Sequence, residues 1–275
     1  NTATGAFSLN ANTTGANNVG LGWQALTANT TASSNTAVGS LALLANTTGA
    51  TNAALGMQAL KANTTGEHNT AVGHNALLVN QTGDQNVAVG NYSLDANTGL
   101  GNTAVGYCAL SGNTSADGNT AVGRLALAVS TTGAENTVVG YRAGCQLTSG
   151  SNNTLIGQQA GTSGSPVSLQ AGSNRIVLGN NDITDSYIKV DWTVTSDLRD
   201  KMNIESVPYG LDFVNQITPI KYNFKKSRED ATSHGKKRFG FKAQEILALE
   251  GENPVLVDNE DTDNLKLTGA YLVPV

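Results

Sequence analysis

The sequence predicts a mainly β protein: 17-residue repeats build a β-solenoid or β-roll shaft that forms a parallel homotrimer, and a small α+β domain follows. Three observations lead to this class. A short motif, seen as NTAVGSLALLANTTGAT at residues 35–51, recurs along most of the chain. Glycine is frequent, at 31 of 275 residues, while aromatic residues make up 5% and charged residues 13%, a composition typical of repetitive β-structure. Residues 1–179 hold four Lys or Arg and five Asp or Glu, against twelve and sixteen in residues 180–275, which predicts a domain boundary.

Each repeat opens with Asn, which we number position 0, and the repeats advance by 17 residues with one step of 16. The starts are Asn1, Asn18, Asn35, Asn52, Asn69, Asn86, Asn102, Asn119, Asn136 and Asn153. Gly occupies position +4 in every repeat, and Leu occupies position +8 until Gly144 and Gly161 replace it in the last two. A period this short holds one coil of a solenoid and is too short for a pair of helices.

The two corners of the coil are predicted from residue types. Gly at position +4 is expected to turn the chain between two short strands, because only Gly takes a positive φ without steric cost. The polar NTTG segment predicts the second corner. There, Asn and Thr side chains are expected to satisfy backbone groups, and stacked Asn residues to form ladders along the axis.

The strand motif TAV or VAV predicts a strand that is apolar on both faces, since its small apolar residues are consecutive. One face fills the coil. The other is expected to be a column exposed on a monomer, formed by Ala37, Ala54, Ala71, Ala88, Ala104 and Ala121. Soluble proteins avoid such a stripe, so we expect the chain itself as partner, in a parallel homotrimer packed about the fibre axis. A lone solenoid with a larger interior is the alternative.

The pattern NTAVG..AL...TTG..N over residues 1–165 resembles the head repeats of trimeric autotransporter adhesins and the shafts of phage tail fibres. The resemblance implies the architecture and leaves the ligand open, because such repeats carry many different surfaces. Adhesin heads are built on shorter repeats, so the coil shape and handedness stay open.

The repeats give no sign of a cofactor or metal site. The calcium-binding GGxGxD motif is absent, and His68, His74 and His234 lack ligand spacing, so neither a cofactor nor a metal is expected. Cys108 and Cys145 are interpreted as small buried hydrophobic residues without a designed disulfide.

Rows of Thr at one position of the repeat raise the question of a binding surface. The row contains Thr47, Thr64 and Thr131. In principle such a row orders ice or glycan, but we interpret it as structural, as Thr at β-corners usually is.

The repeat pattern decays through TSGSPVSLQAGSN, and residues 166–194 are predicted as a linker with the last shaft strands, in NRIVLGNND and in SYIKVDWTV at 186–194. Residues 195–275 are predicted as the α+β domain. Its expected elements are a helix in PYGLDFVNQI with Leu211, Val214 and Ile217 on one face, a strand IKYNF, a charged loop KKSREDATSHGKK, a strand and helix in FGFKAQEILAL, and an acidic loop DNEDTDN.

Separate pieces of residues 195–275 resemble, in order, the endosialidase-type intramolecular chaperone. They comprise Ser196, Asp197, Arg199, Lys201, Asn203 and Ile204; Leu211, Pro219 and Tyr222; Gly240, Phe241, Ala243, Gln244 and Glu245; and Tyr271 and Pro274. The resemblance implies a domain that trimerises, guides assembly of the β-fibre before it, and in many members cleaves itself off by serine proteolysis. The family's long C-terminal helix is expected after YLVPV, and Asn1 already lies inside a repeat, so we expect a segment of a longer protein.

By this resemblance, Ser196 is the nucleophile and Lys201 the base that cleave the Thr195–Ser196 bond in cis. A serine hydroxyl needs a base, and a lysine serves as one when desolvation lowers its pKa. Asp197 and Arg199 are expected to be structural, pairing across the trimer or orienting the loop. Alternatively, Ser196 and Asp197 cap a helix or turn and Lys201 is a solvated charge.

The sequence therefore predicts a structural, host-adhesive tail-fibre protein of a bacteriophage, located in the virion tail. Its expected partners are itself, a host receptor of glycan or outer-membrane type, and other tail proteins. The same modules on a bacterial surface adhesin are the alternative.

A net charge of −5 without a basic stripe argues against nucleic acid as a partner, and the sequence has no apolar run that predicts membrane insertion. Activity on host polysaccharide is not predicted, because paired carboxylates in an aromatic groove are missing and Trp23 and Trp192 lie far apart in sequence. At most, a single-turnover autoprotease is expected.

Overall fold

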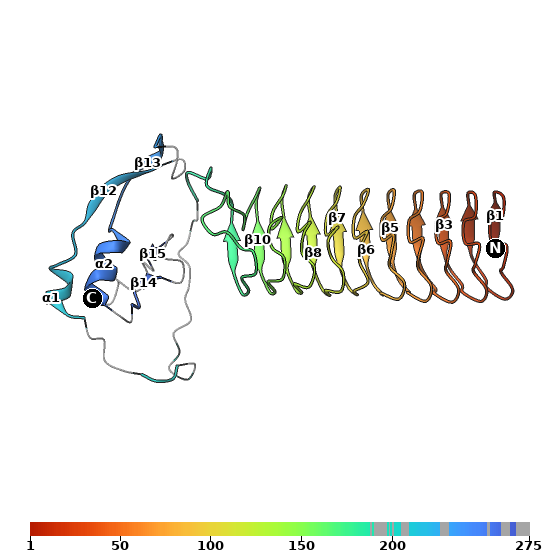
Figure 1. Cartoon of the computed structure of the whole chain (residues 1–275), viewed down its shortest axis with the longest axis horizontal. Coiled ribbons are helices and arrows are strands. Elements are labelled where there is room, and N and C mark those ends of the chain that lie inside the picture. The colour runs from red at the N-terminus through yellow and green to blue at the C-terminus, as the bar shows by residue number, and fades with distance from the viewer. Residues whose placement is uncertain are drawn as a thin grey trace. The chain divides into compact units, whose positions relative to one another are not determined.

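The computed structural model describes residues 1–187, 189, 197, 199, 201–204, 209–225, 231–251, 254–259 and 265–267. The chain divides into two compact units, Asn1–Asp182 and Ile183–Val275 (Figure 1). The first unit is the shaft and the second is a small α+β unit.

The shaft is a solenoid in which one strand of each coil joins a single 11-stranded parallel sheet, ordered β1 to β11 along the chain (Figure 1). The strands are β1 Thr2–Thr4, β2 Val19–Leu21, β3 Thr36–Val38, β4 Ala53–Leu55, β5 Thr70–Val72, β6 Val87–Val89, β7 Thr103–Val105, β8 Thr120–Val122, β9 Thr137–Val139, β10 Thr154–Ile156 and β11 Ile176–Leu178. Thr36 pairs with Ala53, one 17-residue repeat later. This confirms the predicted mainly β fold and its solenoid shaft.

The last coil is longer than the others. Thr154 pairs with Ile176, a step of 22 residues, and the extra length falls in the segment that contains Val167 and Leu169. Both side chains pack on the shaft core. Residues 166–182 therefore complete the solenoid, and the boundary between the two units lies after Asp182.

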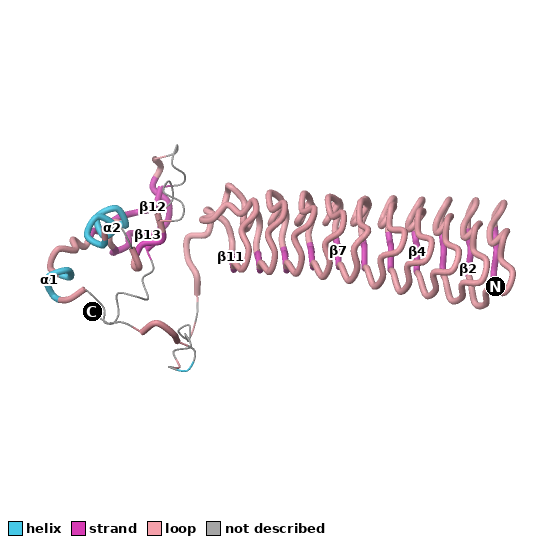
Figure 2. Tube along the Cα trace, turned by 60° about the horizontal axis from the view of Figure 1, so that its bottom comes forward, coloured by secondary structure: helices cyan, strands magenta, loops and turns pink. Residues whose placement is uncertain are grey.

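Each coil holds one three-residue strand, so the expected second strand is missing from the described coils. Figure 2 shows the short strands as magenta segments joined by long pink loops. Positions +6, +8 and +16 take left-handed backbone angles, with φ of 62° at Leu41, 50° at Leu43 and 60° at Thr51. A residue with positive φ interrupts an extended strand. The loops are therefore joined to the next coil by isolated backbone hydrogen bonds and not by a second ladder of strand pairing.

The invariant Gly forms the predicted corner. Its φ lies between 114° and 139° in all ten repeats. At Gly39, an added Cβ would lie 2.5 Å from the carbonyl oxygen of Gly56 in the next coil. The corner therefore needs Gly for its backbone angle and for the close stacking of coils.

The shaft core lies inside the coil and consists of stacked Ala and Leu side chains. The centre of each strand points inward, and Ala37, Ala71 and Ala104 have no exposed surface. The expected exposure of this Ala column is therefore wrong. In a three-residue strand the two end residues share one face and the central residue the other, so positions +1 and +3 point outward.

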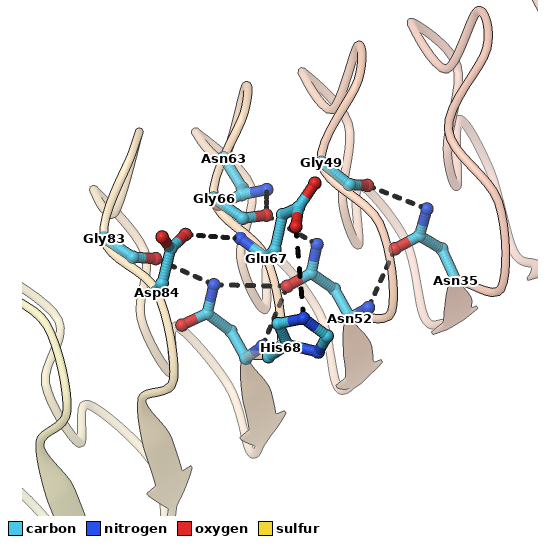
Figure 3. Close-up of polar contacts among 10 residues, drawn as sticks. Asn35, Gly49, Asn52, Asn63, Gly66, Glu67, His68, Gly83 and Asp84 are labelled. Atoms are coloured by element: carbon cyan, nitrogen blue, oxygen red, sulfur yellow. Dashed lines mark hydrogen bonds and ion pairs between the residues drawn. The ribbon is translucent and has the colours of Figure 1, made fainter.

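Two columns of buried Asn run through the shaft. The column at position +11 is the ladder predicted for the NTTG corner, and the column at position 0 is a second one. At position 0, the Asn35 Oδ1 accepts the backbone N–H of Asn52 at 2.9 Å, and the Asn35 amide donates to the Gly49 carbonyl at 2.9 Å (Figure 3). At position +11, Asn63 donates to Gly66 at 2.9 Å and to the Asn46 Oδ1 at 2.8 Å. The side chains thus replace backbone pairing in the loops.

The Thr row has a structural role within the fold. The Thr47 hydroxyl donates to the Thr64 carbonyl at 3.0 Å, and the Thr131 hydroxyl donates to the Thr148 carbonyl at 3.3 Å. Cys108 and Cys145 are free thiols that are half-buried, so the expectation that they are buried is wrong.

The second unit comprises α1 Leu211–Val214, β12 Ile220–Lys225, β13 Ser233–Gly240, α2 Ala243–Glu250, β14 Val257–Asp258 and β15 Lys266–Leu267. Strands β12 and β13 form one antiparallel pair and β14 and β15 another. A small core contains Phe213, Ile246, Leu256 and Val257.

Several expectations for this unit are confirmed and others are wrong. The strand at 220–224 and the strand-to-helix passage at 239–249 are confirmed. The predicted helical face is wrong, because α1 has four residues, Phe213 is buried and Leu211 is 79% exposed. The charged loop is also wrong from Ser233 onward, where β13 begins.

Two further expected elements lie mostly outside the described residues. Within the expected strand at 186–194, Ser186, Tyr187 and Lys189 are described and are not in a strand. Within the acidic loop, Asp258 belongs to β14 and residues 260–264 lie outside the described residues.

Candidate functional site

The predicted cleavage site falls at the start of the second unit. Thr195 and Ser196 lie outside the described residues, so the structure does not place the predicted nucleophile or the bond that it attacks. Lys201 is described and exposed. The pairing of Ser196 with Lys201 therefore stays a prediction.

Asp197 and Arg199 pair with each other within one chain. The Arg199 guanidinium contacts the Asp197 carboxylate at 2.5 Å, and the Arg199 backbone N–H donates to the Asp197 Oδ1 at 2.9 Å. The Arg199 side chain lowers the pKa of Asp197 from its usual range. Since both side chains are exposed, the pair holds the local turn and adds little to stability.

Glu250, which the sequence analysis did not single out, organises the C-terminal side of the second unit. Its carboxylate accepts the backbone N–H groups of Val255 at 2.8 Å, Leu256 at 2.7 Å and Val257 at 3.0 Å. Burial, followed by the Glu250 charge, raises the pKa of the Tyr209 hydroxyl. A carboxylate at the end of a helix, whose backbone partners lie five to seven residues further along the chain, has no sequence signal of its own.

The β12–β13 pair presents large apolar side chains to solvent. Phe239 is 81% exposed, Phe224 is 54% exposed and Phe241 is 36% exposed. A two-stranded pair gains little stability alone and needs a partner surface. Exposed aromatic rings on such a pair are typical of a surface that becomes buried on assembly.

The shaft also has an uncharged outward surface, formed by positions +1 and +3 of the strands and called the strand face. Position +1 is mostly Thr, and position +3 is apolar in every strand after the first. Position +3 carries Thr4, Leu21, Val38, Leu55, Val72, Val89, Val105, Val122, Val139, Ile156 and Leu178. Val105 and Ile156 are 37% and 44% exposed. No coil has a charged residue at +1 or +3, so the strand face is a continuous uncharged surface along the axis.

The described residues contain no group of three or more His, Cys, Asp or Glu side chains that would hold a metal ion. Within the same residues, no helix has the length and apolar character needed to cross a bilayer.

Residues 196–255 match a protein-family profile described as chaperone of endosialidase. The matched range begins at the predicted nucleophile and extends through β12, β13 and α2. No curated protein matches the chain, and no solved structure matches it. The comparisons therefore support a chaperone-type segment next to a β-solenoid shaft, and the shaft is characterised by its own geometry alone.

Proposed function

We propose that this chain belongs to a bacteriophage tail fibre, in which the shaft is a structural and host-adhesive part of a parallel homotrimer. The second unit is the intramolecular chaperone that assembles it. The observation that carries the proposal is the succession of a repetitive solenoid and a segment that matches the chaperone-of-endosialidase profile at residues 196–255.

Assembly of such a shaft has a register problem. Every coil from β2 to β10 presents nearly the same strand face, so two shafts displaced by one coil make almost the same contacts. The sequence of the shaft thus leaves several pairings with similar free energies. A non-repetitive unit that trimerises first fixes one register, and the shafts then associate from that end.

Two surfaces support the parallel homotrimer. The uncharged strand face runs along the shaft, and the β12–β13 pair exposes Phe224 and Phe239. Identical chains aligned in parallel bring each surface next to its own copies.

Self-cleavage follows from the same assembly. In the proposed reaction, the Ser196 hydroxyl oxygen attacks the Thr195 carbonyl carbon while Lys201 accepts the hydroxyl proton. The Thr195–Ser196 C–N bond breaks as this proton passes to the departing amine, which leaves an ester between the two residues. Water then hydrolyses the ester, so that Thr195 ends in a carboxylate and Ser196 regains its hydroxyl. Lys201 is exposed in the single chain. A lysine acts as a base where its surroundings exclude water, so we expect the active arrangement to form only in correctly assembled fibres.

The intact masses of the protein with and without Ser196→Ala test this function, together with the native mass of the assembled product. We expect two fragments separated at Thr195–Ser196 from the natural sequence, one uncut chain from the variant, and a trimeric shaft. A single uncut chain from both proteins would contradict the protease role and leave a retained trimerising cap. A monomeric shaft would contradict the homotrimer.

A bacterial surface adhesin with the same modules is the second candidate, because the repeat pattern resembles adhesin heads as well. The tail-fibre proposal places the protein in the virion tail, with other tail proteins and a host receptor as partners. Antibody labelling in electron micrographs separates the two: label on phage tails supports the fibre, and label on uninfected bacterial cells supports the adhesin.

A further inference from the structure

The corner after the invariant Gly carries aromatic rings or guanidinium groups in five consecutive coils. Positions +5 and +6 hold His74, Tyr92, Tyr107, Arg124, Tyr141 and Arg142, which together are called the tyrosine–arginine edge. The rings of His74 and Tyr92 lie 5.3 Å apart and those of Tyr92 and Tyr107 lie 6.0 Å apart, both edge to face. Further along, the Arg124 guanidinium lies 5.6 Å from the centre of the Tyr141 ring.

The edge is accessible to a ligand. Tyr107 is 48% exposed and Tyr141 is 40% exposed. Arg124 and Arg142 are also exposed, and neither has a carboxylate partner within the described residues.

Charge is separated around the coil. Positions +5 and +6 contain no acidic residue in any coil, whereas they hold two of the four basic residues of residues 1–179. The acidic residues of the repeats are Glu67, Asp84, Asp95, Asp117 and Glu135, at positions +9, +15 and +16. The tyrosine–arginine edge is therefore the part of the shaft best suited to an anionic ligand.

The side chains of the tyrosine–arginine edge suit a ligand that has both sugar rings and carboxylate groups. The flat apolar face of a tyrosine ring packs against the apolar face of a pyranose, while its hydroxyl stays available for hydrogen bonds. A guanidinium group binds a carboxylate through two parallel hydrogen bonds. Coils stack at about 4.8 Å, so these groups recur along the axis and match a linear polymer better than a compact molecule.

We propose that the tyrosine–arginine edge binds linear polysaccharides that carry carboxylate groups, stacking sugar rings on Tyr107 and Tyr141 and pairing carboxylates with Arg124 and Arg142. The inference rests on the proposed host-attachment function and names its ligand class and residues. A nucleic acid is a poorer ligand, because its dense phosphate charge calls for many more cations than the edge has.

Affinity electrophoresis of the full chain tests this site, in gels that contain polygalacturonate, alginate or hyaluronate, with neutral dextran as a reference. We expect retardation by at least one acidic polymer and none by dextran. The double variant Arg124→Gln and Arg142→Gln should weaken the apparent affinity about tenfold or more, and Tyr107→Ser with Tyr141→Ser should do the same. Lys61→Gln, which removes one positive charge at position +9, is the matched control and should leave retardation unchanged.

Several outcomes would overturn the inference. They are a lack of binding to all three acidic polymers, equal retardation by dextran, stronger retention by single-stranded poly(dT), or undiminished binding by the double variants. Circular dichroism and native mass of each variant confirm that the fold and assembly are unchanged, which is expected for exposed side chains.

Attachment of the same proteins to a panel of capsulated bacteria separates this inference from the proposed function. Cell attachment that persists in the double variants contradicts the edge as the binding site and leaves the adhesive function intact. Binding to acidic polymers without attachment to any cell contradicts host attachment and leaves the edge as a polysaccharide site.

Discussion

At the scale of single residues, the two repeats in which Gly replaces Leu at position +8 show how the core is compensated. Gly144 and Gly161 keep the left-handed backbone of this position, with φ of 59° and 74°. The lost volume is filled by Val138 and Leu155, which stand at strand centres where the other repeats carry mostly Ala and which are fully buried. The sequence showed the change from Leu to Gly at position +8. That the larger residue at the strand centre compensates for it becomes clear only when the coils are stacked.

Asp95 gives the shaft a dependence on pH. Its Oδ1 atom is buried without a hydrogen-bond partner in the structure, and burial raises the pKa of the carboxyl above its ordinary value. A raised pKa in the folded state means that the fold binds the proton more tightly than the unfolded chain does. Stability from this group is therefore present at low pH and is lost as the pH rises through the raised pKa.

We expect Asp95→Asn to raise the unfolding temperature at neutral pH, by a small amount because the residue is only half-buried. The difference from the natural protein should shrink as the pH falls towards the pKa of Asp95. Thermal unfolding monitored by circular dichroism across this range measures the effect. Asp117→Asn is the control, because Asp117 is exposed and either side chain accepts the Leu100 N–H. An equal gain at every pH, or none, would contradict the role of burial.

At the scale of the coil, the structure shows which parts of the fold could be predicted from the sequence. The repeat spacing gave the coil length, the Gly corner and the Asn ladders, because these depend on residues at fixed intervals. The number of strands per coil could not be predicted, because residues such as Leu43 adopt a positive φ that is uncommon for Leu. The orientation of Ala37 was predicted wrongly. Both faces of its strand carry apolar residues, so the sequence pattern does not indicate which face points into the coil.

The Asn ladder at position +11 ends where the sequence changes. The Asn113 Oδ1 and the Ser130 Oγ of the next coil are both buried without hydrogen-bond partners in the structure. Earlier in the ladder, an Asn donates to the preceding Asn, as in Asn46 to Asn29 at 3.0 Å. The exception is Asn80, whose Oδ1 is also buried without a partner in the structure although Asn97 follows it.

We therefore expect Ser130→Asn to stabilise the shaft by about 1 kcal/mol. The new amide can donate a hydrogen bond to the Asn113 Oδ1, and the substitution removes the unpaired Ser130 hydroxyl. Chemical denaturation of the full chain measures the change. Ser115→Asn, at an exposed position, is the matched control and should have no effect. A loss of stability would mean that Leu147 in the following coil leaves too little room for the larger side chain.

At the scale of the whole molecule, the two units have different sources of stability. The shaft has a continuous core of stacked Ala and Leu within one chain, whereas the second unit has a small core and several exposed aromatic residues. The chaperone-type segment could be recognised from short motifs of the sequence. The geometry of its predicted cleavage site could not, since Ser196 lies outside the described residues and Lys201 is exposed in a single chain.

This difference predicts separate effects of substitutions in the two units. Phe239→Ser removes the most exposed aromatic ring of the β12–β13 pair. If the second unit starts assembly, this variant should be monomeric by native mass and still give the β-signal of the shaft by circular dichroism, because the Ala and Leu core needs no partner chain. Lys237→Ser, on the same strand, should remain trimeric.

Val105→Lys places a charge on the strand face. If the proposed homotrimer forms, this variant should stay trimeric through its second unit, and the unfolding temperature of the shaft should fall because a charge buried between shafts is costly. Val129→Lys is the matched control, since Val129 is 42% exposed but lies at position +10, outside the strand face. Equal effects of the two lysines would show that the strand face is not the contact between chains. A monomeric Val105→Lys protein together with a trimeric Phe239→Ser protein would reverse the order of assembly and make the shaft the nucleus.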